Sequence, residues 1–210
     1  YYCIIGGWVL KYFLAFLTGD WANAADDGYF TGFITSEVPP IVFDIIFLGA
    51  TVVVIYMGVN KGIERISKVL MPILLVMIVG ISIFALTLHG TGEDGVARSG
   101  LDGLKVYLIP SFKGMGIKDI LIVIMVAMGI MIAYGSYVED DANLMKSVNQ
   151  IEIFDTLVAV LAGVMIIPSV VVFMGPEGMA SKGPGLMFIA MPKVFAAMGG
   201  VGRIIGIVFF

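Results

Sequence analysis

The sequence predicts an all-α polytopic membrane protein. Of its 210 residues, 60% are hydrophobic and only 13% are charged, and the mean hydropathy is +1.05. Soluble domains carry about 25% charged residues, so this composition excludes an ordinary cytosolic enzyme. Twelve basic residues against sixteen acidic ones leave no cationic stripe for phosphates. We therefore expect the lipid bilayer as a partner and no nucleic acid.

Apolar segments near the length of a membrane-spanning helix recur along the chain. They cover about 1–17, 41–57, 70–88, 120–137 and 151–173, and a sixth begins at 201 and is cut at 210. A helix needs roughly 20 apolar residues to cross the hydrocarbon core and satisfies its own backbone hydrogen bonds there. Because both ends of the chain lie inside apolar runs, we expect 1–210 to be a single membrane domain that is a fragment of a longer chain.

The stretch 184–198 is apolar but too short to cross a bilayer, which favours a re-entrant or lid helix. Its side of the membrane follows from the basic residues Lys61, Arg65 and Lys68, which crowd the short link between the second and third segments. The positive-inside rule puts that link in the cytoplasm. Counting forward, 184–198 is predicted to be extracellular.

Three charged residues fall inside or near the predicted spans, where charge is costly and often functional. Lys11 has a stem long enough to reach the interface, and Asp44 is close enough to the start of its segment to lie there. Asp155 lies one turn into the fifth segment, with no basic residue one turn away on either side. Two interpretations stay open for Asp155: an interfacial carboxylate at a helix end, or an oxygen ligand for Na⁺ or H⁺ coupling.

Pro72 interrupts the third segment. It removes one backbone donor and its ring clashes with the carbonyl of Lys68, so the cytoplasmic half of this helix should unwind easily. A static kink is the alternative, since proline kinks are common in membrane helices. Glu64 and Lys68 form an i,i+4 pair that would hold the wound form by a few tenths of a kcal/mol.

Five stretches together resemble the neurotransmitter:sodium symporter family, bacterial branch, with the leucine-transporter fold. They are residues 1–8, 61–72, 133–137, 154–157 and 183–188, and they occur in the family's order. The resemblance implies a partial inverted-repeat fold that runs from the family's third transmembrane helix to the start of its eighth. Such repeats bind substrate and ions near the bilayer midplane between broken helices.

The resemblance also implies binding residues. Tyr2 would meet the substrate carboxylate through its hydroxyl, a neutral donor that can be buried without a counter-charge. Met128 and Gly129, in the sixth helix, would contribute to the substrate site. Asp155 would help to bind a sodium ion, which is the expected cofactor.

Gating residues are implied in the same way. Gly62 and Pro72 match the Gly-to-Pro spacing of the family's fifth helix, which is linked to the opening of an inner water path. Tyr137 resembles a tyrosine of the inner gate. The stretch 184–198 resembles the outer loop that plugs the vestibule.

We therefore expect a sodium-coupled symporter of a neutral amino acid that works by alternating access, in the cell membrane (the bacterial inner membrane). This chain alone should be inactive, because the family's first and second helices carry most of the sodium and substrate ligands.

One departure leaves an alternative open. Family members carry a Gly-Gln-x-Phe-Phe-x-x-Ser-type segment in the middle of the sixth helix, and about three turns of it are missing ahead of 127–129. The alternative is a non-transporting membrane remnant that has lost one wall of its site. An intramembrane enzyme is disfavoured, because the spans hold no Ser/His or paired-Asp constellation and the single histidine, His89, follows the third segment.

Overall fold

The computed structural model describes residues 2–56, 64–92, 95–109, 116–118, 121, 144–178 and 185–210. The chain divides into two compact units. The first consists of Tyr1–Tyr107 and Val160–Phe210, and the second of Leu108–Ala159. One long helix contributes to both units.

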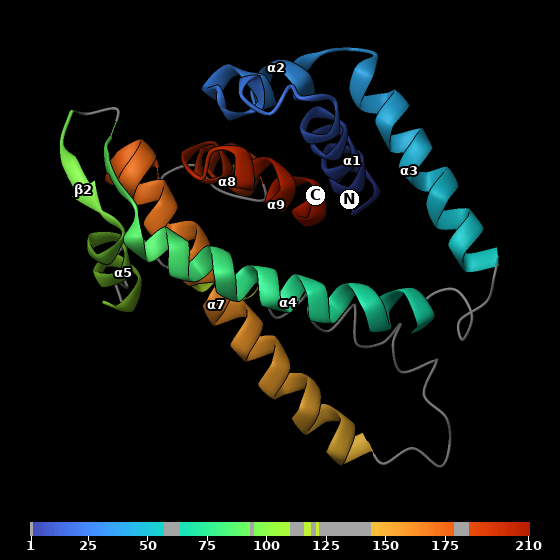
Figure 1. Ribbon diagram of the computed structural model, residues 1–210. Coiled ribbons are helices and arrows are strands. Elements are labelled where there is room, and N and C mark those ends of the chain that lie inside the picture. The colour runs from blue at the N-terminus through green and yellow to red at the C-terminus, as the bar shows by residue number, and fades with distance from the viewer. Residues whose placement is uncertain are drawn as a thin grey trace. The chain divides into compact units, whose positions relative to one another are not determined.

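Helices make up most of the described part of the chain (Figure 1). They are α1 (Tyr2–Thr18), the 3-10 turn η1 (Asn23–Ala25), α2 (Asp27–Thr35), α3 (Pro39–Tyr56), α4 (Glu64–Thr87), α5 (Gly100–Leu108), α7 (Leu144–Gly178), α8 (Gly185–Ala197) and α9 (Gly200–Phe209). Between α4 and α5, strands β1 (His89–Thr91) and β2 (Ala97–Ser99) form an antiparallel hairpin in which Gly90 pairs with Arg98.

Three stretches among the described residues are long and apolar enough to cross a membrane. They are Pro39–Tyr56, Arg65–Thr87 and Met145–Gly175, and they overlap the segments expected at 41–57, 70–88 and 151–173. Helices α1, α8 and α9 are shorter apolar helices, and the segment expected at 120–137 lies mostly outside the described residues. Two helices begin about two turns earlier than hydropathy indicated, because turns that mix charged or polar residues with apolar ones precede the continuous apolar runs of α4 and α7.

Helix α4 is wound through Pro72, which lies inside it. The helix begins at Glu64 and continues to Thr87, so the loss of one backbone donor at Pro72 does not end it. The structure therefore shows the wound form of this helix. The predicted unwinding remains a prediction, and its second residue, Gly62, lies outside the described residues.

The core of the first unit is built from aromatic side chains around Phe188 of α8, which is fully buried. The Phe188 ring stacks on Phe30 of α2 at a centroid distance of 5.5 Å and an interplanar angle of 6°. It meets Trp8 edge-on at 5.6 Å and Tyr12 at 5.4 Å, both from α1, and Phe210 at 5.9 Å. Such pairs add about 0.5–1.5 kcal/mol each beyond the area that they bury. Residues distant in sequence are thereby joined into one core.

Glycines let neighbouring helices approach closely. A Cβ atom at Gly7 of α1 would lie 2.9 Å from the backbone nitrogen of Asp44 and 3.2 Å from its Cα, both in α3. A Cβ at Gly103 of α5 would collide with the backbone of Pro168 in α7. These contacts are between backbones, so a side chain at either position cannot be accommodated by a rotamer change alone.

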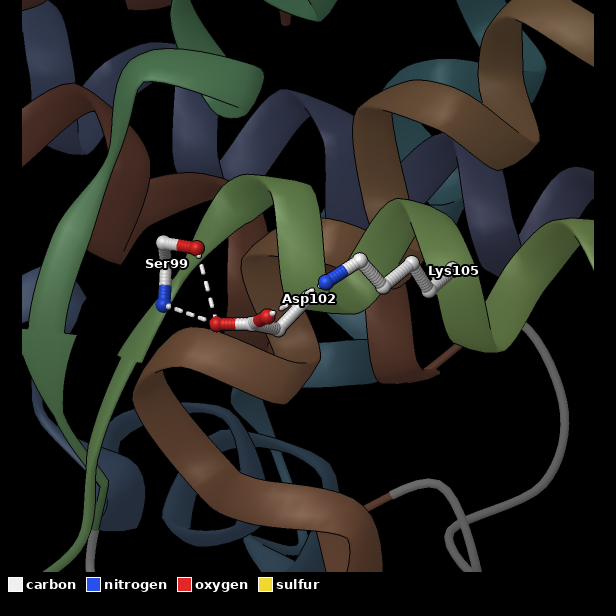
Figure 2. A network of polar contacts seen from close by, with 3 residues as sticks. All are labelled: Ser99, Asp102 and Lys105. Carbon is white, nitrogen blue, oxygen red and sulfur yellow. Dashed lines mark hydrogen bonds and ion pairs between the residues drawn. The ribbon is translucent and has the colours of Figure 1, made fainter.

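Helix α5 begins with a capping arrangement (Figure 2). The Asp102 carboxylate accepts hydrogen bonds from the Ser99 backbone N–H at 3.1 Å and the Ser99 hydroxyl at 2.8 Å. Lys105 lies 3.5 Å from the other oxygen. This is the reciprocal half of a capping box, in which an acidic side chain in the first turn satisfies the N-cap backbone donor. The two hydrogen bonds from Ser99 lower the pKa of Asp102, with a smaller contribution from Lys105.

The close approach of α1 and α3 predicts that Gly7→Ala is destabilising. The added methyl group forces the α3 backbone to move, and overpacking of this kind costs about 1–3 kcal/mol. We expect a lower Tm for the detergent-purified variant. The matched control is Gly49→Ala in α3, where nothing lies within 4 Å of the added atom. Equal melting temperatures for the two variants would contradict the tight α1–α3 contact.

The cap of α5 predicts a pH dependence. Because the pKa of Asp102 lies below its ordinary value of 3.8, its stabilising contribution is fully present above pH 3.8 and is lost as the pH falls through the folded-state pKa. Carbon-13 NMR of the carboxyl group should show an Asp102 pKa below that of an unstructured aspartate. Ser99→Ala should raise it, and an unchanged pKa in that variant would show that the Ser99 hydroxyl contributes nothing.

Candidate functional site

Tyr2, the residue expected to meet a substrate carboxylate, lies at the start of α1. Its side chain is 72% exposed. The neighbouring Gly6 and Gly7 are buried, so this part of α1 is held against α3 while the Tyr2 side chain stays accessible. That accessibility is compatible with contact to a ligand.

Asp155, the expected sodium ligand, lies in α7 and is exposed. The residues beside it are exposed as well, Phe154 at 60% and Leu157 at 46%. Asp155 belongs to the second unit, whereas Tyr2 belongs to the first. No group of three or more His, Cys, Asp or Glu side chains able to hold a metal ion occurs among the described residues. The role of Asp155 as a sodium ligand therefore stays a prediction.

Of the other predicted site residues, only Pro72 lies in the part of the chain that the structure describes. Met128, Gly129, Tyr137 and Gly62 lie outside the described residues. Pro72 lies on an open apolar groove of about 450 Å³, and the other lining residues are Ile73, Val76, Met77, Ile204, Ile205 and Val208. These side chains come from α4 and α9 and carry no oxygen ligand. The groove at Pro72 is thus a packing surface for apolar groups.

Lys11 was expected to reach the membrane interface, and the structure gives its ammonium group aromatic partners. It lies 5.1 Å from the ring centroid of Tyr29 in α2 and 6.0 Å from that of Phe43 in α3. A cation over such rings gains roughly 0.5–2 kcal/mol, depending on desolvation. Burial raises the pKa of Tyr29, and the neighbouring Lys11 partly opposes this rise. Sequence reasoning missed this contact, because Tyr29 lies outside the predicted spans.

Polar contacts surround the start of α2. Asp20 accepts hydrogen bonds from the Asn23 amide at 2.6 Å and the Tyr29 hydroxyl at 3.3 Å. Asp27, in the first turn of α2, forms an ion pair with Lys193 of α8. The Lys193 side chain is only 13% exposed, whereas that of Asp27 is 58% exposed. This ion pair fixes α8 to α2 beside the aromatic core.

Asp44 lies in α3. One of its carboxylate oxygens, Oδ1, is buried and has no hydrogen-bond partner in the part of the chain that the structure describes. The residue packs by its backbone against Gly7. Sequence reasoning placed Asp44 near the membrane interface, and that placement stays a prediction.

Comparison with known proteins identifies relatives. The model of the sodium:neurotransmitter symporter family matches residues 36–210. The sodium-dependent transporter YhdH of Bacillus subtilis (strain 168) is 30% identical over 205 residues, which cover 93% of this chain and 43% of that protein. A sodium-dependent transporter of Haemophilus influenzae is 29% identical over 224 residues, covering all of this chain and 46% of that protein.

Comparison with solved structures also identifies a relative. The chain superposes on the crystal structure of MhsT in complex with L-phenylalanine with a TM-score of 0.74 and 31% identity, covering all of this chain and 47% of MhsT. The chain therefore spans about half the length of the relatives that it matches. The alignment with the Haemophilus protein runs over 224 residues against 210 in this chain, so that relative has additional residues within the aligned region.

The fold and the apolar helices define a multi-pass helical membrane protein of the transporter class. The chain belongs to the sodium:neurotransmitter symporter family. The predicted family and the predicted partial leucine-transporter fold are both confirmed.

The Lys193–Asp27 ion pair predicts that Asp27→Asn is destabilising. The nearly buried ammonium group loses its carboxylate partner, and the exposure of Asp27 limits the cost to about 1 kcal/mol. Thermal unfolding of the purified variants would measure it, with Asp26→Asn as the control, since the Asp26 side chain makes no capping hydrogen bond.

A double-mutant cycle isolates this interaction from the charge itself. Asp27→Asn combined with Lys193→Met should cost less than the sum of the two single changes. Additive effects would show that the ion pair contributes no coupling energy.

Proposed function

We propose that this sequence is part of a sodium-coupled symporter for a neutral amino acid. The observation that carries the proposal is the match to MhsT over the whole of this chain at 31% identity, together with relatives named as sodium-dependent transporters. The ligand in the MhsT structure is L-phenylalanine, which has an uncharged side chain. An amino-acid substrate with a free carboxylate also suits the phenol at the start of α1.

In this proposal, Tyr2 donates its hydroxyl hydrogen bond to the substrate carboxylate. Tyr2 is 72% exposed. Its hydroxyl is a neutral donor, which binds a carboxylate without the cost of burying a cation. Met128 and Gly129 would line the same site from the sixth helix. The substrate would then be selected by its side chain through residues of the first and sixth helices.

Asp155 is proposed as a carboxylate ligand for sodium. Sodium binding must favour one conformational state over another to drive transport, because an ion with equal affinity for both states shifts nothing. An anionic ligand attracts Na⁺ without an accompanying anion. Gly62, Pro72 and Tyr137 are the proposed gating residues, with α4 unwinding around Pro72 as the inner path opens.

A second candidate is a membrane remnant that does not transport. It is favoured by the additional residues that the Haemophilus relative carries within the aligned region and by the missing sixth-helix pattern ahead of 127–129. Loss of that segment would remove one wall of the substrate site. Long-read sequencing of the source locus across codons 116–138 distinguishes a real deletion from an error in the sequence.

The proposal is tested with the complete protein encoded at that locus, reconstituted into liposomes. We expect an inward sodium gradient to drive uptake of L-phenylalanine or another neutral amino acid, and replacement of Na⁺ by K⁺ to abolish it. Binding or uptake that is the same in Na⁺ and K⁺ would contradict sodium coupling. Absence of uptake for all neutral amino acids, in folded protein, would favour the remnant.

Asp155→Ala should raise the sodium concentration for half-maximal uptake by about tenfold, because one charged ligand is lost. The amino-acid concentration for half-maximal uptake at saturating sodium should change little. Glu152→Ala is the matched control, since Glu152 is an exposed carboxylate one turn earlier in the same helix. An unchanged sodium dependence in Asp155→Ala would reject Asp155 as a ligand.

A further inference from the structure

Two separate sets of hydrogen bonds cap the C-terminal end of α1. The first is local: the Asp20 N–H donates to the carbonyl of Ala15 at 2.8 Å across Gly19, whose φ is +93°. This is the Schellman arrangement, which favours glycine in the left-handed region. The last four carbonyls of a helix have no partner within the helix, so those after Ala15 need other donors.

The second set of hydrogen bonds comes from Arg203, a residue near the other end of the chain. The Nε of Arg203 in α9 donates to the carbonyl of Phe16 at 3.1 Å, and its Nη2 donates to the carbonyl of Leu17 at 2.9 Å. These hydrogen bonds join residues 187 and 186 positions apart. The planar guanidinium can serve both carbonyls at once because its donors are held in a fixed fork.

The position of Arg203 is unfavourable within its own helix. It is the fourth residue of α9, and a positive charge in the first turn opposes the helix dipole. At the C-terminal end of α1 the same charge is favourable, because it faces the negative end of that dipole. On electrostatic grounds, the contact with α1 explains why an arginine occupies this position, and the stability of α9 does not.

Arg203 also lies at one end of a continuous contact between the two helices. Further along α9, Gly206 approaches the ring of Phe16 so closely that a Cβ would collide with it. Phe210 then meets Tyr12 at a centroid distance of 5.1 Å. Residue numbers rise along α9 as they fall along α1, so the helices are antiparallel. The hydrogen bonds of Arg203 fix the register of this pair.

We infer that Arg203 is a positioning residue for transport: it fixes α9, and α8 joined to it, against the helix that carries Tyr2. The inference rests on the proposed function. Arg203 does not contact the proposed substrate ligand, because Tyr2 lies about 22 Å along the α1 axis from the carbonyls that Arg203 binds. In the family's inverted repeat, α1 is the third helix and α9 the start of the eighth, so Arg203 joins one repeat to the other. Its removal should disturb the conformational cycle while leaving substrate affinity nearly unchanged.

The test uses the complete reconstituted protein and the variants Arg203→Gln and Arg203→Lys. For Arg203→Gln, corrected for the amount of folded protein, we expect the maximal sodium-driven uptake rate to fall by about fivefold or more, as the loss of charged hydrogen bonds suggests. The KM for substrate should stay within about twofold, since no ligand contact is lost. Arg203→Lys should be intermediate, because an ammonium keeps the charge but not the fork. Lys105→Gln, which removes an exposed charge from α5, should resemble the wild type.

Hydrogen exchange provides a readout that does not depend on transport. Amides of residues 12–20 should exchange faster in Arg203→Gln than in the wild type, and Arg203→Lys should restore part of the protection. If the wild type shows no uptake, the proposed function fails while the exchange measurement still tests the contact. Unchanged exchange in Arg203→Gln would overturn the inference, and so would a raised KM with an unchanged maximal rate. If Arg203→Gln does not fold, wild-type exchange and uptake rate in Arg203→Lys would overturn it.

Discussion

The packing of Phe188 is the contact on which the first unit depends. The residue is fully buried between Trp8 and Tyr12 of α1 and Phe30 of α2, so three helices meet at one ring. A helix of 13 residues is too short to cross a bilayer, and its position must come from such side-chain contacts. Lys193, on the same helix, forms an ion pair with Asp27 of α2. This ion pair adds a directional polar interaction to an otherwise apolar contact. In the described structure α8 is therefore attached to α1 and α2.

The sequence was sufficient for the elements whose signal is contained within one segment. The spans at α3, α4 and α7 follow from continuous apolar composition, and the family follows from several motifs in order. The cap of α5 also had a local signal, Ser99-x-x-Asp102, which is the capping-box pattern. No helix was predicted at 100–108, because this segment is short and carries the charged residues Asp102 and Lys105.

Contacts between distant segments had no such local signal. The hydrogen bonds of Arg203 cross 186 and 187 positions of sequence, and the partner atoms are backbone carbonyls that any residue possesses. Lys11 presents the same difficulty, because its aromatic partners Tyr29 and Phe43 come from two other helices. Hydropathy alone predicts where a charge is costly. It does not predict which neighbouring ring or helix end will accept that charge.

Helix association in an apolar medium explains why these contacts take the form they do. Lipid tails are as apolar as leucine, so burial of apolar side chains gives little net drive to bring two spans together. Close backbone approach and polar contacts must supply it. On one side α1 uses Gly6 and Gly7, buried against α3. On the other, it meets α9 through Gly206 and Arg203. Small residues and the helix-end hydrogen bonds of Arg203 thus hold in place the helix that begins at Tyr2.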